Sequence, residues 1–374
     1  MKKSRLFLSI CVFFIGINFN SVLISAFSFR PHPGCNLVYY SQGDYNWSCA
    51  YVGGAQFEPN GCAPTCLAMI ASSFGHITSP LEWGEKMLAG HFWRKNGGTG
   101  NLPPDIAAKY GLPISYVEFA MSLEGLNATP LWTQSELEDF LKSSSFPVTA
   151  ACYFESLEPT MPGETLHAVI LSEYRNGQTF LIDPSSNAVT GWWDVSTIWK
   201  IRRSRSYGDS DKNAWAADFY GISGRQMCAG VYRLYNPFVR DNLIQLPDGV
   251  DGFYNEGVGL HHYTINTYEI EKMANEGWSY EQVAFLDKGE HPLYRLFNPN
   301  DGNHHFTMNV NERDDLVNRG WHDEGVGWRV ALAGQPVFRI YNPGNGEHIY
   351  TLNYEEVKAA VAAGMIDEGV AWWC

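Results

Sequence analysis

The sequence is short of positive charge, and beyond its N-terminus it lacks long apolar runs and low-complexity tracts. Lysine and arginine number 26 against 40 aspartate and glutamate residues, which gives a formal net charge of −14. So acidic a chain is a poor candidate for binding nucleic acid or an anionic membrane. After the first residues no stretch approaches the roughly 20 apolar residues of a membrane span. At 374 residues and 45% hydrophobic, the chain is long enough for about two folded domains.

The one sustained apolar run lies at the N-terminus. Leu6–Phe19 follows three basic residues and precedes the small-residue site Ser25-Ala26. This order is typical of a secretory signal peptide, which we expect to be cleaved near Ala26. Cleavage removes three positive charges, so the mature net charge becomes −17. The sequence therefore predicts a secreted, extracellular protein with no membrane span in the mature chain.

Cysteine is scarce, and its count after the predicted signal peptide is odd. Cys11 lies in the signal, and seven cysteines follow it. Outside the cytosol an odd count leaves one thiol over, either because it is reactive or because pairing is partial. Two cysteines, Cys62 and Cys66, lie in "NGCAPTCLAM". A zinc site of these two with His76 would have an incomplete ligand set, and no second cysteine pair has ligand spacing.

The C-terminal third repeats itself three times. The copies begin with "VYRLYNP" (231–237), "LYRLFNP" (293–299) and "VFRIYNP" (337–343), and the first carries an insertion at about 238–255. Each continues with "HHYT", "HHFT" or "HIYT", an amphipathic helical stretch and a closing strand. Repeats of this kind signal one supersecondary unit, here strand, turn, strand, helix, strand. Three copies favour a closed, pseudo-threefold module over an open solenoid.

A charged stretch rich in glycine and serine separates the two halves and predicts a domain boundary. We expect a signal peptide over 1–26, an α+β domain over 27–205, a linker over 206–227 and a β-rich triple-repeat domain over 228–374. In the α+β domain, helices are expected after Cys62, from Asn101 and from Ser135. Strands are expected over 147–154, 167–174 and 178–184, with Arg-Asn-Gly as the hairpin turn between the last two.

Four residues of the N-terminal domain form a candidate catalytic set. Cys62 stands at a helix N-terminus, where the helix dipole and free N–H groups lower a thiol pKa. His167 opens a predicted strand and Asp183 closes the next, so a hairpin brings this base and its orienting carboxylate side by side. Gln42 is the candidate donor to an oxyanion, with Gln56 as a weaker rival.

Taken together, "YYSQGDYNW", "NGCAPTCLAM" and "LHAVILSEYRNGQTFLIDP" resemble the papain-like cysteine peptidases. The similarity is to the stand-alone relatives of the bacteriocin-processing, double-glycine peptidases, and it covers 38–193. It implies a helix packed on an antiparallel sheet, a peptide or protein substrate and no cofactor. It also implies the site roles, which are nucleophile for Cys62, base for His167, orienting residue for Asp183 and oxyanion donor for Gln42.

Two positions depart from the family pattern, because Ala63 replaces the usual glycine and Cys66 the usual serine. Each site residue also has a structural alternative. His167 could be a core histidine, Asp183 a turn residue and Gln42 a surface loop residue. Cys62 could instead form a disulfide with another N-terminal cysteine, although one helical turn to Cys66 is an awkward span for such a bond.

With Cys62 set aside as nucleophile, six cysteines remain for disulfides. Cys228 stands just before the first repeat and Cys374 is the last residue, so a bond between them would tie the ends of the module together. The expected pairs are Cys228–Cys374, Cys35–Cys49 and Cys66–Cys152.

The repeats resemble a unit of about 45 residues, of unknown function, at the C-terminus of secreted bacterial proteins, some of them wall hydrolases. The resemblance implies attachment to a cell-surface glycan or wall material, and the candidate contact residues are Trp278, Trp321 and Trp372. Three equivalent histidines either make one repeated hydrogen bond inside each unit, which is the preferred interpretation, or meet as a metal site on the threefold axis. They are His261, His304 and His348.

The sequence thus predicts a secreted papain-like cysteine hydrolase with a C-terminal binding module. Amide hydrolysis in wall peptides and transpeptidation are alternatives on the same fold. A catalytically inert adhesin is the non-enzymatic alternative. The complete set of Cys62, His167, Asp183 and Gln42 argues against inertness, since an inert domain has no reason to keep all four.

Overall fold

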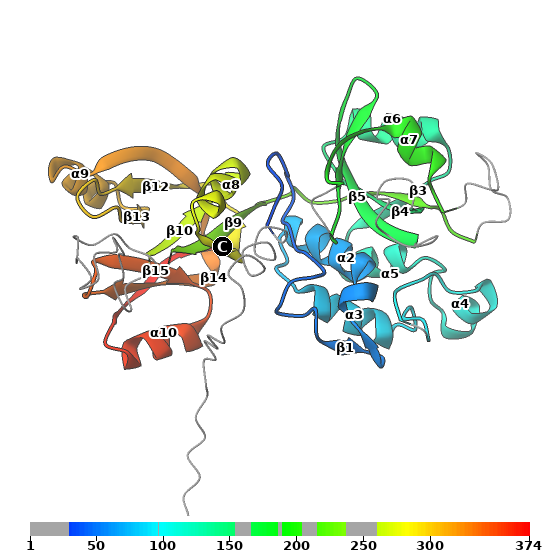
Figure 1. Cartoon of the computed structure of the whole chain (residues 1–374), viewed down its shortest axis with the longest axis horizontal. Coiled ribbons are helices and arrows are strands. Elements are labelled where there is room, and N and C mark those ends of the chain that lie inside the picture. Colours follow the sequence, from blue (N-terminus) through cyan, green and yellow to red (C-terminus); the bar gives the residue numbers. More distant parts are fainter. Residues whose placement is uncertain (1–29, 96, 154–165, 186–188, 204–214, 237–259) are drawn as a thin grey trace, which may run out of the picture.

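The computed structural model describes residues 30–95, 97–153, 166–185, 189–203, 215–236 and 260–374. The predicted signal peptide, the first part of the predicted linker and the insertion in the first repeat lie outside these ranges. The N-terminal body combines helices with one large sheet, and the C-terminal body combines three small helices with short sheets (Figure 1). None of the helices in the described ranges is long and apolar enough to cross a bilayer.

The N-terminal body is built on a six-stranded antiparallel sheet in the order β3-β8-β4-β5-β6-β7. Its strands are β3 (Asn127–Leu131), β4 (Val148–Tyr153), β5 (Leu166–Arg175), β6 (Gln178–Ile182), β7 (Gly191–Asp194) and β8 (Phe219–Ser223). One face carries α2 (Cys62–Ser73), α3 (Pro80–Ala89), α4 (Pro104–Tyr110) and α5 (Tyr116–Leu123). The other carries α6 (Gln134–Ser143) and α7 (Val195–Lys200). A small hairpin of β1 (Tyr51–Val52) and β2 (Ala55–Gln56), with the short η1 (Glu58–Asn60), leads into α2.

Helix α2 is the centre of this body, since 11 of its 12 residues are buried. Its small and aliphatic side chains allow close packing on β5, where Ala168 and Ile170 belong to the same core. The turn between β5 and β6 has Asn176 and Gly177 at φ of 50° and 86°, the left-handed pair of a tight hairpin. The predicted hairpin is therefore confirmed, and it places His167 on β5 and Asp183 directly after β6.

Strand β8 differs from the sequence expectation, because it lies inside the stretch assigned to the linker. It pairs with both β3 and β4 and so completes the sheet between them. Phe219 and Ile222 are fully buried there, one in each of the two cores. A glycine- and serine-rich neighbourhood hid a strand that only its long-range partners stabilise.

The C-terminal body shows the same order of elements three times. The first set is β9 (Ala229–Asn236), β10 (Leu260–Thr264), α8 (Thr267–Asn275) and β11 (Ser279–Asp287). The second is β12 (His291–Phe297), β13 (His304–Thr307), α9 (Val310–Asn318) and the start of β14 (His322–Asn342). The third uses the rest of β14 with β15 (Glu347–Thr351), α10 (Tyr354–Ala362) and β16 (Ile366–Trp373). Within each set the strands pair antiparallel.

Aromatic rings from equivalent positions fill the centre of this body. Three rings lie 5.6–6.0 Å apart between centroids, and they belong to Tyr263, Phe306 and Tyr350. Three more lie 5.6–6.2 Å apart, and they belong to Phe285, Trp328 and Trp372. The metal-site alternative for the equivalent histidines is therefore wrong, because aromatic rings occupy the place where the three units meet. Trp372 is 0% exposed, which contradicts its assignment as a surface contact residue.

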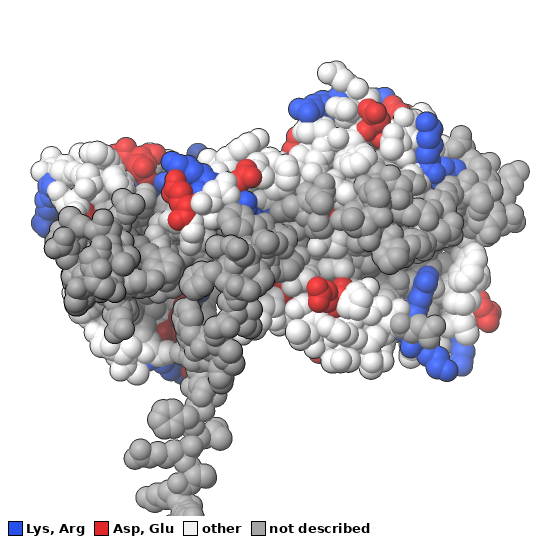
Figure 2. All heavy atoms as spheres, viewed as in Figure 1, with Lys and Arg blue, Asp and Glu red and all other residues white. Residues whose placement is uncertain are grey.

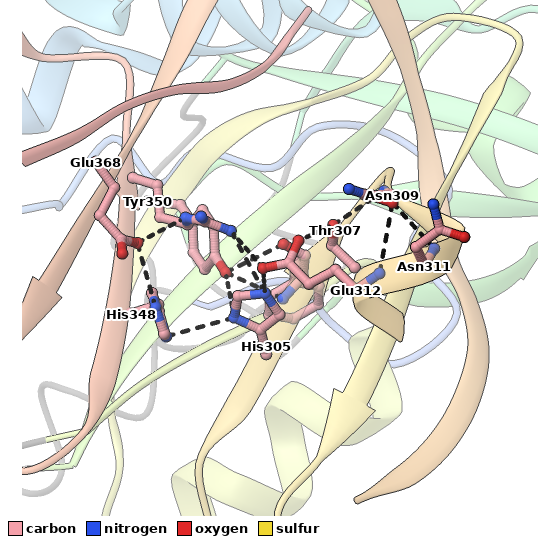
Figure 3. Close-up of polar contacts among 10 residues, drawn as sticks. His305, Thr307, Asn309, Asn311, Glu312, His348, Tyr350 and Glu368 are labelled. Carbon is pink, nitrogen blue, oxygen red and sulfur yellow. Dashed lines mark hydrogen bonds and ion pairs between the residues drawn. The ribbon is translucent and has the colours of Figure 1, made fainter. Parts of the chain in front are cut away.

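Charged side chains link each unit to the next around this centre. Each helix glutamate binds the arginine of the following unit, and the pairs are Glu269–Arg295 (2.8 Å), Glu312–Arg339 (3.3 Å) and Glu356–Arg233 (2.9 Å). The last pair closes the ring between the third unit and the first. Each equivalent histidine faces a glutamate of its own unit, in His261–Glu281 (3.7 Å), His304–Glu324 (3.3 Å) and His348–Glu368 (3.3 Å). Figure 3 shows His305, Glu312, His348 and Glu368 at the second junction. Each of these histidines therefore makes the same contact inside its own unit, which is the arrangement that the preferred interpretation of the sequence expected.

On the face shown in Figure 2, basic side chains lie in small groups close to acidic ones. The acidic excess of the sequence is therefore not collected into one broad patch on this face. Pairing of this kind limits like-charge repulsion in a chain with a net charge of −14.

The two bodies are joined by hydrogen bonds to the segment that leads to Gln42. The buried Tyr232 hydroxyl accepts from the Tyr39 N–H and donates to the Leu37 carbonyl, both at 3.1 Å. The Cys228 N–H donates to the Ser73 carbonyl at the end of α2 (2.7 Å). The C-terminal body is thus packed against the elements that carry the candidate catalytic residues.

Replacing Tyr232 with phenylalanine is expected to lower the free energy of unfolding by about 1–3 kcal/mol, because two buried backbone groups lose their partner. Denaturant unfolding of the full-length protein measures this. Tyr235→Phe, on the same strand but outside this contact, is the control and should change stability by less than about 0.5 kcal/mol. Equal, small effects of both variants would show that the contact contributes nothing.

Candidate active site

Cys62 is the first residue of α2, and the turn before it is rigidly held. Gly61 lies against the Phe57 ring, so a Cβ at position 61 would come within 2.4 Å of the ring. The Thr65 N–H and hydroxyl both donate to the Gly61 carbonyl, at 2.9 and 2.7 Å. The first N–H groups of a helix have no partner inside the helix. The Cys62 thiol therefore sits beside backbone donors and the positive end of the helix dipole.

His167 and Asp183 meet as the hairpin predicts. Nε2 of His167 lies 2.7 Å from Oδ1 of Asp183, and the two residues are 4% and 0% exposed. The same carboxylate oxygen accepts from the backbone N–H and the hydroxyl of Ser185, each at 2.8 Å. Because the carboxylate is held by this turn, it can in turn fix the orientation of the imidazole ring.

The other side of the imidazole faces Cys62. With Nε2 bound to Asp183, Nδ1 is the ring nitrogen left for the hydrogen bond that joins His167 to the thiol. Cys62 is the one residue of α2 that is not fully buried, so it is the point of the helix nearest to solvent. The nucleophile Cys62, the base His167 and the orienting carboxylate of Asp183 are therefore each in contact with the next.

The electrostatics favour an ion pair at this site. Burial acts to raise the pKa of the Cys62 thiol, but the charge and hydrogen bond of His167, with backbone hydrogen bonds from Ala168 and Ala63, lower it below its ordinary value. Burial acts to lower the pKa of His167, but the Cys62 charge and the Asp183 hydrogen bond raise it to about 10. Thiolate and imidazolium are therefore the favoured forms at neutral pH.

The pH profile of kcat/KM should reflect this pair. Cys62 must lose its proton, and its lowered pKa places the acidic limb below the ordinary thiol range. His167 must keep its proton, and its raised pKa places the alkaline limb near 10. We expect a plateau through neutral pH, measured with a soluble peptide substrate. Asp183→Ala should move the alkaline limb to lower pH. An alkaline limb near the ordinary histidine pKa in the unaltered protein would contradict the ion pair.

Gln42 lies between the two halves of this site and is 8% exposed. Its backbone N–H donates to the Pro184 carbonyl (2.8 Å), next to Asp183. Its Nε2 donates to the Glu58 carbonyl in the turn before Cys62 (2.7 Å), which leaves the second Nε2 hydrogen for another acceptor. The rival Gln56 instead donates to the Ser48 carbonyl at 3.4 Å.

Cys66 is close to the site but is a poor nucleophile. Its Sγ donates to the Ala168 carbonyl (3.5 Å), and burial followed by the nearby Cys62 charge raises its pKa well above the ordinary thiol value. The side chain therefore stays a neutral thiol in the core. Sequence reasoning missed Ser185 and the Ala168 backbone as partners of the set. The Asp-Pro-Ser order after a strand, typical of a side-chain-bonded turn, was the available signal for Ser185.

The three predicted disulfides are not formed in this structure, where all seven described cysteines are free, and they stay predictions. Cys66 and Cys152 belong to the cores on opposite faces of the sheet. Cys35 is buried against the Leu37 carbonyl, whereas Cys49 is exposed. Cys228 and Cys374 both lie near Lys288, but as thiols. The pairs were predicted from the positions of the cysteines along the chain. Those positions do not determine how far apart two cysteines lie in the fold or where their side chains point.

No metal-binding group of three or more histidine, cysteine or acidic residues occurs among the described residues. His76, the third member of the zinc alternative, lies beyond the far end of α2 and pairs with Glu124 at 2.9 Å. It is therefore separated from Cys62 by the length of the helix.

Two families match parts of the chain. Residues 36–210 match the Peptidase_C39 like family, and residues 250–374 match a domain of unknown function, DUF5648. The comparison with curated proteins found no match. The first match supports a cysteine peptidase acting on a peptide substrate, carried by the N-terminal part of the chain.

Two solved structures are similar at low identity. The peptidase domain of Streptococcus ComA, described as a bi-functional ABC transporter of a quorum sensing pathway, shares 12% identity over 51% of this chain and 98% of that one, with a TM-score of 0.30. A C39-like peptidase from Bacillus anthracis shares 16% identity over 45% of this chain and 90% of that one, with a TM-score of 0.26. Similarity this low adds nothing to the family match.

Proposed function

We propose that this protein is a secreted cysteine peptidase that hydrolyses peptide bonds through Cys62, His167 and Asp183. The observation that carries the proposal is the thiol of a partly exposed cysteine at a helix N-terminus, hydrogen-bonded to an imidazole that Asp183 holds at 2.7 Å. The match of residues 36–210 to the C39-like peptidases supports the same reaction class.

The reaction proceeds through an acyl-enzyme. The Cys62 thiolate attacks the carbonyl carbon of the scissile bond, and the oxyanion is stabilised by the Cys62 N–H and the second Nε2 hydrogen of Gln42. His167 gives its proton to the leaving amine as the C–N bond breaks. The imidazole then takes a proton from water, which attacks the thioester and releases the acid and the free thiolate. Asp183 keeps the ring in place throughout.

The same acyl-enzyme also serves the alternatives on this fold. If an amine in place of water attacks the thioester, the product is a new amide, which is transpeptidation. If the substrate is a wall peptide, the enzyme is an amidase. Product analysis with and without an added amine acceptor separates these outcomes, and none of them changes the role of Cys62.

Active-site labelling tests the proposal. With an iodoacetamide probe at neutral pH, Cys62 should be alkylated first, because it is the thiol with the lowered pKa. The exposed Cys49 is the comparison within the same protein, and it should react more slowly in spite of its greater access. Faster labelling of Cys49, or recovery of Cys62 in a disulfide from active protein, would overturn the assignment.

We also propose that the C-terminal module attaches the peptidase to a cell surface. Trp278 is partly exposed beside α8, and a cavity opens next to it, whereas Trp321, the predicted contact beside α9, is not assigned to the attachment. Full-length protein with Cys62→Ala, which prevents cleavage of the surface, should co-sediment with cells or wall material. If it stays in the supernatant, the module only braces the peptidase through contacts such as that of Tyr232.

A further inference from the structure

A cavity of about 450 Å³ lies between the first and second repeat units. It is bounded by α8 and Trp278 of the first unit and by the ends of β12 and β13 in the second. A second cavity of about 580 Å³ adjoins it and shares Glu269 and Lys272. Both volumes fall in the roughly 300–1,000 Å³ range of small-molecule sites.

Aromatic rings form one wall of the first cavity. His262 and His304, from neighbouring units, meet at right angles with centroids 4.7 Å apart. Trp278 meets His262 at 6.1 Å and Phe297 meets His304 at 5.1 Å. Trp278 and Phe297 remain partly exposed, so their rings offer apolar surface inside a solvent-accessible cavity.

A buried polar atom in the same cavity lacks a partner. Asn303 is 4% exposed, and its Nδ2 donates to the Asn345 carbonyl at 3.1 Å. This donation fixes the orientation of the amide, because Oδ1 could not bond a carbonyl. Oδ1 is then the free end, and it has no hydrogen-bond partner among the described residues. An acceptor that is buried without a hydrogen-bond partner favours the binding of a ligand that carries a hydrogen-bond donor.

The charges around the cavity favour a neutral ligand. Glu269 is already held by Arg295 at 2.8 and 3.1 Å, so neither partner is free for an ion. The remaining charged residues of the first cavity, Lys272 and Glu276, have opposite signs. Burial lowers the pKa of His262, which keeps that ring neutral at neutral pH. Neither a phosphate nor a cationic ligand would find an excess of opposite charge here.

The equivalent positions of the other units do not offer the same combination. Glu347 takes the place of Asn303 in the third unit, and its carboxylate already accepts from Nδ1 of His261 at 2.9 Å. Met365 takes the place of Trp278 there, and Leu260 takes the place of Asn303 in the first unit. The free acceptor and the exposed tryptophan therefore meet at the first junction.

We propose that this cavity binds a neutral saccharide, with a sugar ring against Trp278 and Phe297 and a hydroxyl donating to Asn303. Pyranose rings present C–H groups on one face and hydroxyl groups at the edge, so they need an apolar ring surface beside fixed polar atoms. The adjoining cavity beyond Glu269 provides room for a second sugar residue. The inference deepens the attachment role proposed above and is independent of the peptidase reaction.

Calorimetric titration of the full-length protein tests this site, with tetramers of β-1,4-linked glucose and of β-1,4-linked N-acetylglucosamine as probes. At least one tetramer should bind. Trp278→Met and Asn303→Leu should each weaken binding about tenfold or more. Both changes insert the residue that another unit carries at that position, and a melting curve of each variant separates lost binding from lost stability. Trp321→Met is the matched control at the second junction and should change affinity less than twofold.

Failure of both tetramers to bind the unaltered protein at millimolar concentration would overturn the proposal. So would equal losses in Trp278→Met and Trp321→Met, because the effect would then not belong to this junction. The surface role is tested separately by co-sedimentation of the same variants with wall material. If Trp278→Met abolishes tetramer binding but not sedimentation, the saccharide site stands and the attachment takes place through another surface.

Discussion

Cys62→Ala is expected to lower kcat/KM on a soluble peptide by about 10⁴-fold or more without unfolding the protein. The reason is that no other described thiol can take over. Cys66, one helical turn away, has a raised pKa and points its Sγ at the Ala168 carbonyl. The position itself tolerates alanine, because Cys62 is only partly buried at the first turn of the helix and alanine is a good helix former. Steady-state kinetics together with a melting curve measure both statements.

Cys66→Ser is the matched control for this variant. It changes a thiol in the same helix, and a serine hydroxyl can still donate to the Ala168 carbonyl, so activity should stay within about threefold of the unaltered protein. Substantial hydrolysis by Cys62→Ala, or equal inactivation by Cys66→Ser, would show that Cys62 is not the nucleophile. Loss of the folded state in Cys62→Ala would show in the melting curve and would separate instability from lost chemistry.

Asp183→Ala is expected to lower kcat by about 10²–10⁴-fold and to leave KM within a few-fold. The carboxylate makes the 2.7 Å contact that orients His167, and it is fully buried, so water cannot replace it in the same geometry. Orientation matters in the transition state, when the proton moves, more than in substrate binding. Kinetics over a range of substrate concentrations separate the two parameters.

Asp183→Asn provides the rescue variant for this prediction. Its amide oxygen can still accept from His167 Nε2 and from the Ser185 N–H, although the negative charge is lost. We expect it to recover most of the activity that the alanine variant loses, with an alkaline limb at lower pH. Unchanged turnover in Asp183→Ala would show that this residue has only a structural role in the turn.

The candidate site could be predicted from the sequence because its parts are local. The tight turn at Asn176-Gly177, with a one-residue register shift between Ser172 and Tyr174, sets the pairing of one hairpin, and His167 and Asp183 meet at its open end. The helix start at Cys62 was readable from an Asn-Gly turn signal followed by an apolar run. These features need only neighbouring residues and the geometry of a turn.

The predictions that were wrong concern residues whose structure depends on partners far away in the chain. Strand β8 pairs with β3 and β4, and its strand formers, Phe219, Tyr220 and Ile222, are too short a run in a glycine- and serine-rich neighbourhood to predict a strand. Trp372 is buried because Phe285 and Trp328 of the other units cover it. Composition cannot distinguish an aromatic ring that packs in a core from one that faces solvent.

By itself, the sequence determined the order of the elements, the hairpin that carries the base, the cysteine at the helix start and the threefold recurrence of one unit. Only the tertiary structure decided which cysteines lie on opposite faces of a sheet, which aromatic rings fill the centre of the module, and that Asn303 is left with a free acceptor beside Trp278. Local sequence encodes turns, caps and periodicity, because these involve residues a few positions apart. Burial and side-chain partnership are set by long-range packing, which sequence separation does not specify.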